Sequence, residues 1–103
     1  GDDQRARGKN AEAIPFFKHA IDLDSNFAQA WAKLSEGRSS EFWFFYDRTE
    51  AALARAKASA ERALRLRPDL PGPHVSLAYY HYWGRLDYDA ALRELAIARE
   101  RKP

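Results

Sequence analysis

The chain has 103 residues, of which 46% are hydrophobic, as expected for one small globular domain and not for a disordered segment. Seventeen Lys and Arg residues against fifteen Asp and Glu leave a formal net charge of +2, with the two signs interspersed, so the charge does not point to a nucleic-acid partner. There is no Cys, which excludes disulfides and thiolate chemistry, and no apolar run approaches the roughly 20 residues of a membrane span.

Two residue types, Cys and Met, are absent from the composition, and each absence supports one expectation. A chain without Cys is compatible with a reducing compartment, and we expect a cytoplasmic location. There is no Met either, not even at position 1, which predicts that these residues are a piece of a larger protein.

Helix-favouring residues dominate and strand-like alternation is missing, so we expect an all-α protein. Asn10 is a good N-cap for a first helix in which Pro15 removes one hydrogen bond. A later helix ends shortly before Pro68, another begins at Pro73, and Asp87 caps the last. Apolar residues at steps of three and four predict five helices, over residues 10–23, 27–46, 50–67, 73–83 and 88–101.

Three of these helices repeat one pattern, with offsets of four, seven and twelve residues from a first alanine. Small residues seven apart let a neighbouring helix approach closely, and a proline ends the helix in two of the three. The three sets are Ala13, Phe17, Ala20 and Ser25, then Ala56, Ala60, Ala63 and Pro68, then Ala91, Leu95, Ala98 and Pro103.

The pattern resembles the tetratricopeptide repeat family, whose unit of about 34 residues is an antiparallel helix pair. Trp31-x-x-Leu34-Ser35 is similar to the start of the family's first helix, and Ala-Leu-Arg-Leu-Arg-Pro-Asp at residues 63–69 is similar to its closing motif. His74-x-x-Leu77-Ala78 is a weaker second start. The resemblance implies a solenoid of helix pairs in a single domain, made of a half repeat at 10–26, a long repeat at 27–70 and a repeat at 71–103.

The middle repeat is longer than the family's unit by about nine residues, around the aromatic run at residues 41–46. Phe42, Phe45 and Tyr46 continue the inward stripe begun by Trp31, so we expect this insertion to lengthen two helices and not to form a loop.

In this family the concave face of the solenoid binds proteins or peptides, so we expect a scaffold for protein–protein interaction. The family's clamp for a terminal carboxylate is not expected, because only Lys33 has a suitable charge at the clamp positions. Aromatic side chains on such a face are typical of binding hot spots, unless the insertion folds back and buries them. The expected groove residues are Lys33, Glu36, Trp43, Tyr79, Tyr82 and Trp83. The alternative is a purely structural solenoid or oligomerisation segment of a larger regulatory protein or enzyme.

No set of residues predicts catalysis, a metal or a cofactor. His74 and His81 lie seven apart, whereas helical metal pairs lie three or four apart, so we expect both to pack between helices. His19 and Asp22 have no nucleophile beside them.

The first helix lacks the leading helix that would cover it in a full repeat. Ile14, Phe16 and Phe17 are therefore expected on an uncovered apolar face, which predicts a twofold homodimer through this helix. At the other end Arg99 and Arg101 stand where the family prefers apolar residues, so that face is expected to be polar.

Overall fold

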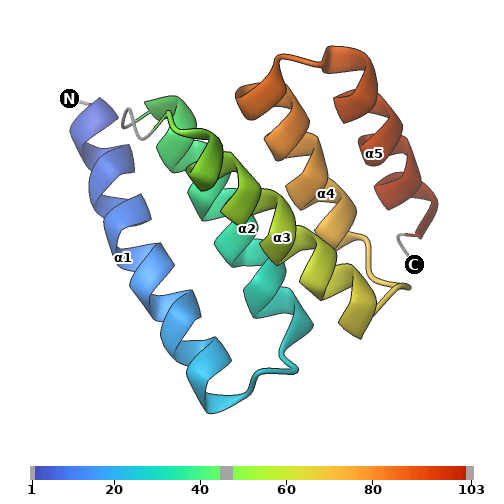
Figure 1. The fold of residues 1–103 in the computed structure, drawn as a ribbon, viewed down its shortest axis with the longest axis horizontal. Coiled ribbons are helices and arrows are strands. Elements are labelled where there is room, and N and C mark those ends of the chain that lie inside the picture. The colour runs from blue at the N-terminus through green and yellow to red at the C-terminus, as the bar shows by residue number, and fades with distance from the viewer. Residues whose placement is uncertain (1, 45–47, 102–103) are drawn as a thin grey trace.

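The computed structural model describes residues 2–44 and 48–101, and over these residues the chain is all-helical with no strand. Sequential helices run antiparallel and lie beside one another, with α1 at one edge and α5 at the other (Figure 1). The molecule measures 36 × 35 × 25 Å, which is about two helix diameters thick. The helices are α1 (Asp2–Leu23), α2 (Ala28–Phe44), α3 (Glu50–Leu66), α4 (Gly72–Tyr79), its π-helical continuation η1 (Tyr80–Arg85), and α5 (Tyr88–Arg101).

Most helix boundaries agree with the sequence prediction. Helix α5 has the predicted bounds, and the Asp87 carboxylate accepts a hydrogen bond from the Ala90 N–H at 3.1 Å, as expected of its cap. The N-cap of α3 is Thr49, whose hydroxyl accepts from the Ala52 N–H. Helix α2 continues through the described part of the aromatic run to Phe44, whereas Phe45 and Tyr46 lie outside the described residues.

Two boundaries were predicted wrongly. Helix α1 begins at Asp2 and not at Asn10, because the polar residues before Asn10 extend the helix without adding apolar periodicity. The fourth helix does not stay α-helical to Trp83, because its backbone widens into η1 from Tyr80 to Arg85. Leu86 then adopts a left-handed conformation with φ of 53°, and the Asp87 N–H donates to the His81 carbonyl at 2.9 Å. This arrangement is typical of a helix C-terminus.

Small side chains bring α2 and α3 into close contact. Ala56, Ala60 and Ala63 have no exposed surface, and Ser35 Oγ on α2 donates to the Ala56 carbonyl at 2.6 Å. This confirms that the repeated alanines mark a helix contact in α3. Leu53, 1% exposed, is the largest of the fully buried side chains and clusters with Ala56 and Tyr80.

Helix α4 lies in the groove between α2 and α3 and pairs with α5. Ser76 Oγ on α4 donates to the Ala32 carbonyl at 2.8 Å, and His74 Nδ1 lies 2.7 Å from Glu94 Oε2 on α5. His74 is buried at this helix interface, as the sequence predicts.

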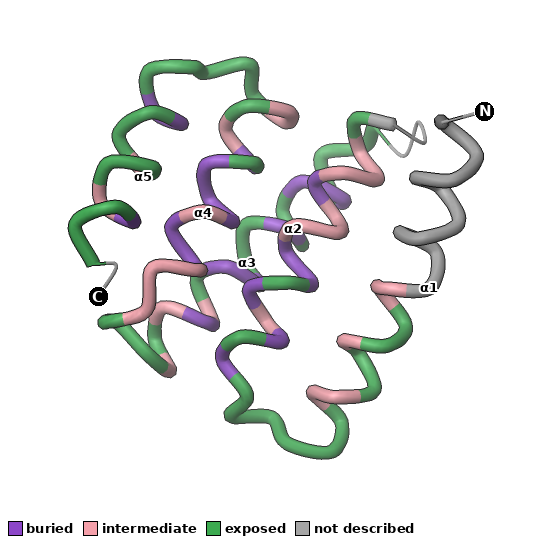
Figure 2. The backbone as a smooth tube through the Cα atoms, turned by 180° about the vertical axis from the view of Figure 1, so that it is seen from behind, coloured by how far each residue is buried: buried purple, intermediate pink, exposed green. Residues whose placement is uncertain are grey.

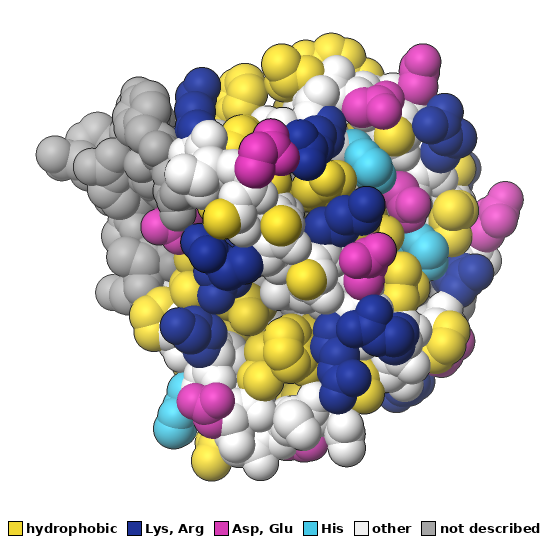
Figure 3. Space-filling model, viewed as in Figure 1, with side chains coloured by type: hydrophobic (Ala, Val, Ile, Leu, Met, Phe, Trp, Pro, Cys, Tyr) yellow, Lys and Arg dark blue, Asp and Glu magenta, His cyan; other side chains and the backbone are white. Residues whose placement is uncertain are grey.

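Burial is greatest on α2, α3 and α4 and falls toward both edges of the row of helices (Figure 2). Among the described residues α1 packs against α2 alone, and none of the side chains described on α1 is buried. No described helix combines the length and the apolar character needed to cross a membrane. Both signs of charge are interspersed with hydrophobic side chains over the face seen in Figure 3.

Candidate binding surfaces

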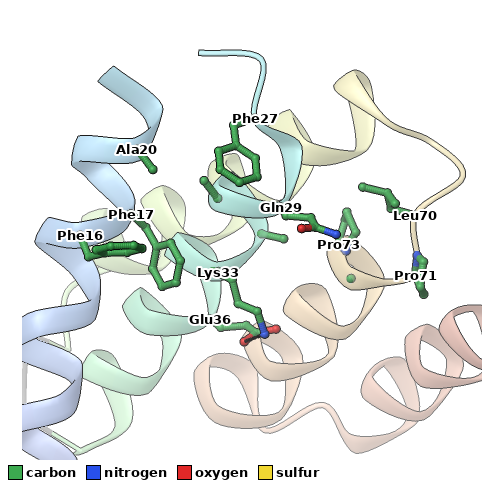
Figure 4. A pocket seen from close by; sticks show the side chains of 13 residues that line it. Phe16, Phe17, Ala20, Phe27, Gln29, Lys33, Glu36, Leu70, Pro71 and Pro73 are labelled. Carbon is green, nitrogen blue, oxygen red and sulfur yellow. Dashed lines mark hydrogen bonds and ion pairs between the residues drawn. The ribbon is translucent and has the colours of Figure 1, made fainter. Parts of the chain in front are cut away.

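A groove of about 570 Å³ lies over the first half of α2, between α1 and the start of α4. Phe16 and Phe17 enter it from α1, Phe27 stands at the start of α2, and Leu70 and Pro71 form the far rim (Figure 4). We call this surface the N-terminal groove. Its lining residues are Phe16, Phe17, Ala20, Phe27, Gln29, Ala30, Ala32, Lys33, Glu36, Leu70, Pro71, Gly72 and Pro73.

The lining of this groove is mostly apolar and carries one acidic and one basic side chain. Glu36 Oε2 accepts from Lys33 Nζ at 3.4 Å, and the Glu36 side chain is only 23% exposed. Burial raises the pKa of the Glu36 carboxyl, and the nearby Lys33 ammonium lowers it in part. The Lys33 side chain is 57% exposed and its contact with Glu36 is long, so a ligand cation can replace the Lys33 ammonium at little cost. The groove therefore offers a partly desolvated carboxylate that can accept hydrogen bonds from a ligand cation.

A second surface lies at the opposite end, between the last turns of the α4–η1 helix and α5. Its volume is about 410 Å³, and no charged side chain is among the described residues that line it. The Tyr79 and Trp83 rings stack with centroids 4.8 Å apart, and the Tyr82 and Tyr88 rings lie 5.3 Å apart. We call this surface the C-terminal pocket. It is lined by Ala78, Tyr79, Tyr82, Trp83, Tyr88, Ala91, Leu92 and Leu95.

The residues expected to form one groove are divided between these two surfaces. Lys33 and Glu36 line the N-terminal groove, whereas Tyr79, Tyr82 and Trp83 line the C-terminal pocket. Trp43 is 37% exposed near the end of α2 and lines neither surface, with the Arg48 guanidinium 5.8 Å from its ring centroid.

The residues expected to mediate self-association overlap the N-terminal groove. Phe16 is 66% exposed, Phe17 is half-buried, and their rings meet edge to face with centroids 5.2 Å apart. Both line the groove, whereas the half-buried Ile14 does not. A second copy bound at Phe16 and Phe17 would thus compete with a ligand in the groove.

The expectation of a polar C-terminal face is wrong in part, because this face carries exposed apolar side chains as well as charged ones. Leu92 is 63% exposed and Leu95 is 44% exposed, and both line the C-terminal pocket. The Arg101 side chain instead donates to the Pro68 carbonyl at the α3–α4 connection. Arg99 and Glu100 line a further surface of α5 together with Leu92, Leu95 and Ala96, so charged and apolar side chains share this face.

Sequence reasoning missed the contribution of α5 to the C-terminal pocket. Tyr88, Leu92 and Leu95 follow one another at steps of four and three, which is the spacing of one helix face. The sequence analysis listed Leu95 only as a member of the repeated pattern and gave Tyr88 and Leu92 no role, so this shared face was not recognised.

No group of three His, Asp or Glu side chains able to hold a metal ion occurs in the described parts of the chain. In comparisons with known proteins, no family model, no curated protein and no solved structure matches this chain.

Proposed function

We propose that this chain is a non-catalytic protein-interaction module, a tetratricopeptide-type solenoid whose N-terminal groove binds an apolar peptide segment. The antiparallel row of helices and the buried alanines between α2 and α3 agree with such a solenoid. The groove lies between α1 and the start of α4, and its volume of about 570 Å³ can hold several side chains of a bound peptide.

The observation that carries this proposal is the half-buried Glu36 in an otherwise apolar groove of about 570 Å³. Large apolar surface with few polar groups is typical of ligand sites, and the polar group fixes the ligand's orientation. A carboxylate whose pKa is raised by burial gains most from a cationic partner. The favoured ligand is therefore a peptide with apolar or aromatic residues and one Lys or Arg directed to Glu36.

Peptide display on the purified chain, followed by calorimetry of the selected peptide, tests the proposal. Glu36→Gln keeps the shape of the side chain and removes its charge, so we expect roughly tenfold weaker binding, about 1.4 kcal/mol. Glu61→Gln is the matched control, because Glu61 is exposed on α3 away from the groove. This variant should bind the peptide as tightly as the wild type does. Equal losses of peptide affinity in the two variants, or a selected peptide whose affinity neither substitution changes, would contradict the proposed site.

A second candidate function is an oligomerisation segment, favoured by the exposure of α1. Helix α1 contacts α2 alone among the described residues, and Phe16 is 66% exposed on it. A twofold dimer through Ile14, Phe16 and Phe17 would cover this face. Light scattering of the wild type and of Phe17→Glu tests it, since the dimer must dissociate in the variant.

A further inference from the structure

The C-terminal pocket lies between the α4–η1 helix and α5. The corresponding groove one repeat earlier, between α2 and α3, is filled by α4 and η1. Among the contacts of α3 with η1, Leu53 lies against Gly84, and the Lys57 ammonium lies 5.8 Å from the centroid of the Tyr80 ring. Ala56 and Ala91 are equivalent positions of the repeat, which relates α3 to α5 by 35 residues. The equivalents of Leu53 and Lys57 are then Tyr88 and Leu92, and both line the C-terminal pocket.

Small residues also lie on the other side of both grooves. Helix α2 receives α4 where Ser76 Oγ donates to the Ala32 carbonyl and Gly72 lies close to the Ala32 side chain. In the C-terminal pocket the small residue is Ala78, beside the aromatic rings of Tyr79 and Trp83, although the repeat aligns Ala78 with Ser35 and not with Ala32. An apolar groove between two antiparallel helices suits an apolar α-helix.

The chain itself carries one helix with an unpartnered apolar face. On α1, Phe16 is 66% exposed and Leu23 is 76% exposed, and their separation of seven positions, about two turns, places both on one side of the helix. Helix α1 makes no contact with α3, α4 or α5 among the described residues, so this side stays open in a single copy.

The exposed apolar areas of the two surfaces are similar in size. At roughly 200 Å² for each large apolar side chain, the C-terminal pocket offers about 400 Å² and α1 about 300 Å², so their contact removes about 700 Å² from water before flanking polar side chains are counted. That total lies below the roughly 1,200 Å² of stable specific interfaces, so the contact is a weak one that forms at high protein concentration. The side chains that supply these areas are Tyr82, Tyr88, Leu92 and Leu95 in the pocket and Phe16 and Leu23 on α1.

We propose that the chain associates head to tail, with α1 of one copy bound in the C-terminal pocket of the next. Either twofold dimer, through α1 or through the pocket, would leave the other apolar surface in water. Head-to-tail contact covers both surfaces in every interior copy. The contact is heterologous, so it continues from copy to copy and the assembly grows with concentration. It goes beyond the proposed peptide binding, because it uses the C-terminal pocket, which is separate from the N-terminal groove; Phe16 belongs to both sites, so a peptide in the groove should compete with this contact.

Two single substitutions block the two surfaces separately. Phe16→Glu places a charge on α1, and Leu92→Glu places one in the C-terminal pocket. Both residues are largely exposed, at 66% and 63%, so the folded chain tolerates the charge. Ala58→Glu, on the exposed side of α3, is the charge-matched control. Circular dichroism at 222 nm verifies that all variants keep the helical content of the wild type.

Analytical ultracentrifugation at about 100 µM, alone and in mixture, distinguishes the possible contacts. We expect the wild type and Ala58→Glu to form species that grow with concentration and each blocked variant to be a monomer. An equal mixture of the two blocked variants should then form a 1:1 dimer and nothing larger, because one free α1 meets one free pocket.

Three results would overturn the head-to-tail contact. If Leu92→Glu dimerises alone and the mixture contains no heterodimer, α1 pairs with α1. If Phe16→Glu dimerises alone, the pocket pairs with itself. A wild type that remains monomeric at about 100 µM would show that neither surface binds a second copy of the chain. None of these results depends on peptide binding in the N-terminal groove, which is measured with a separate ligand.

Discussion

The contact between Gly84 and Leu53 predicts a strong coupling between two substitutions. A Cβ added at Gly84 would lie 2.4 Å from Leu53 Cδ2 and 3.6 Å from Leu53 Cγ, and Leu53 is 1% exposed, so the wild type has little room for it. Overpacking of this kind costs about 1–3 kcal/mol, whereas replacing a helical glycine by alanine contributes about 1 kcal/mol in favour of folding. Gly84→Ala should therefore lower the free energy of unfolding by about 0–2 kcal/mol.

Leu53→Ala reverses the sign of this effect. The substitution alone leaves a cavity and should cost about 2–5 kcal/mol. In that background the alanine at position 84 fills part of the cavity, and it should raise the free energy of unfolding by about 1 kcal/mol. The coupling energy between the two substitutions is then about 1–3 kcal/mol.

Urea unfolding followed at 222 nm on the wild type, the two single variants and the double variant measures this coupling. Additive effects within about 0.5 kcal/mol would refute the reasoning, because η1 would then not pack on α3 at Leu53. If Leu53→Ala alone proves too unstable to measure, Leu53→Val gives the same cycle with a smaller cavity.

Two further predictions concern Glu36 and Leu86. The pKa of Glu36 is raised above its ordinary value of 4.5, so the folded state binds more protons than the unfolded state, and its stability should fall as the pH rises above about 4.5. Glu36→Gln removes this fall. Chemical unfolding of both proteins between pH 4 and 7 (about three pH units) should show that the variant gains stability relative to the wild type as the pH rises. A difference in the free energy of unfolding that stays constant over this range would contradict the raised pKa of Glu36. Leu86 has a φ of 53°, so Leu86→Gly should raise the thermal unfolding midpoint by relieving about 1 kcal/mol of strain, whereas a lower midpoint in calorimetry would show that its side chain stabilises the fold.

Helix positions were predictable where local signals agreed. The Asp87 cap and the alanine pattern define α5, and Pro68 follows within two residues of the end of α3, so these helices have the predicted ends or differ by one residue. The start of α1 and the widening at η1 were not predictable in this way. Polar residues before Asn10 carry no apolar period, and a π-helical turn breaks the period of 3.6 on which the prediction rests.

The candidate surfaces were predictable in composition but not in arrangement. A rotation of about 100° per residue correctly placed Trp43, Tyr79 and Tyr82 on exposed sides of their helices. Helix rotation alone cannot tell which neighbour stands beside each side chain, so residues of two separate surfaces were assigned to one groove. The C-terminal pocket also depends on α5, whose apolar residues become a surface only because no described helix lies beyond it.

The most direct test of the account is a nuclear magnetic resonance titration of the 15N-labelled chain with a peptide selected by display. Binding in the N-terminal groove predicts that amide shifts change mainly at the residues around Phe17, Ala32, Lys33 and Glu36, and that Glu36→Gln weakens these changes. Shifts confined to the C-terminal pocket, or the failure of repeated selections to return any peptide that binds, would contradict the proposed function.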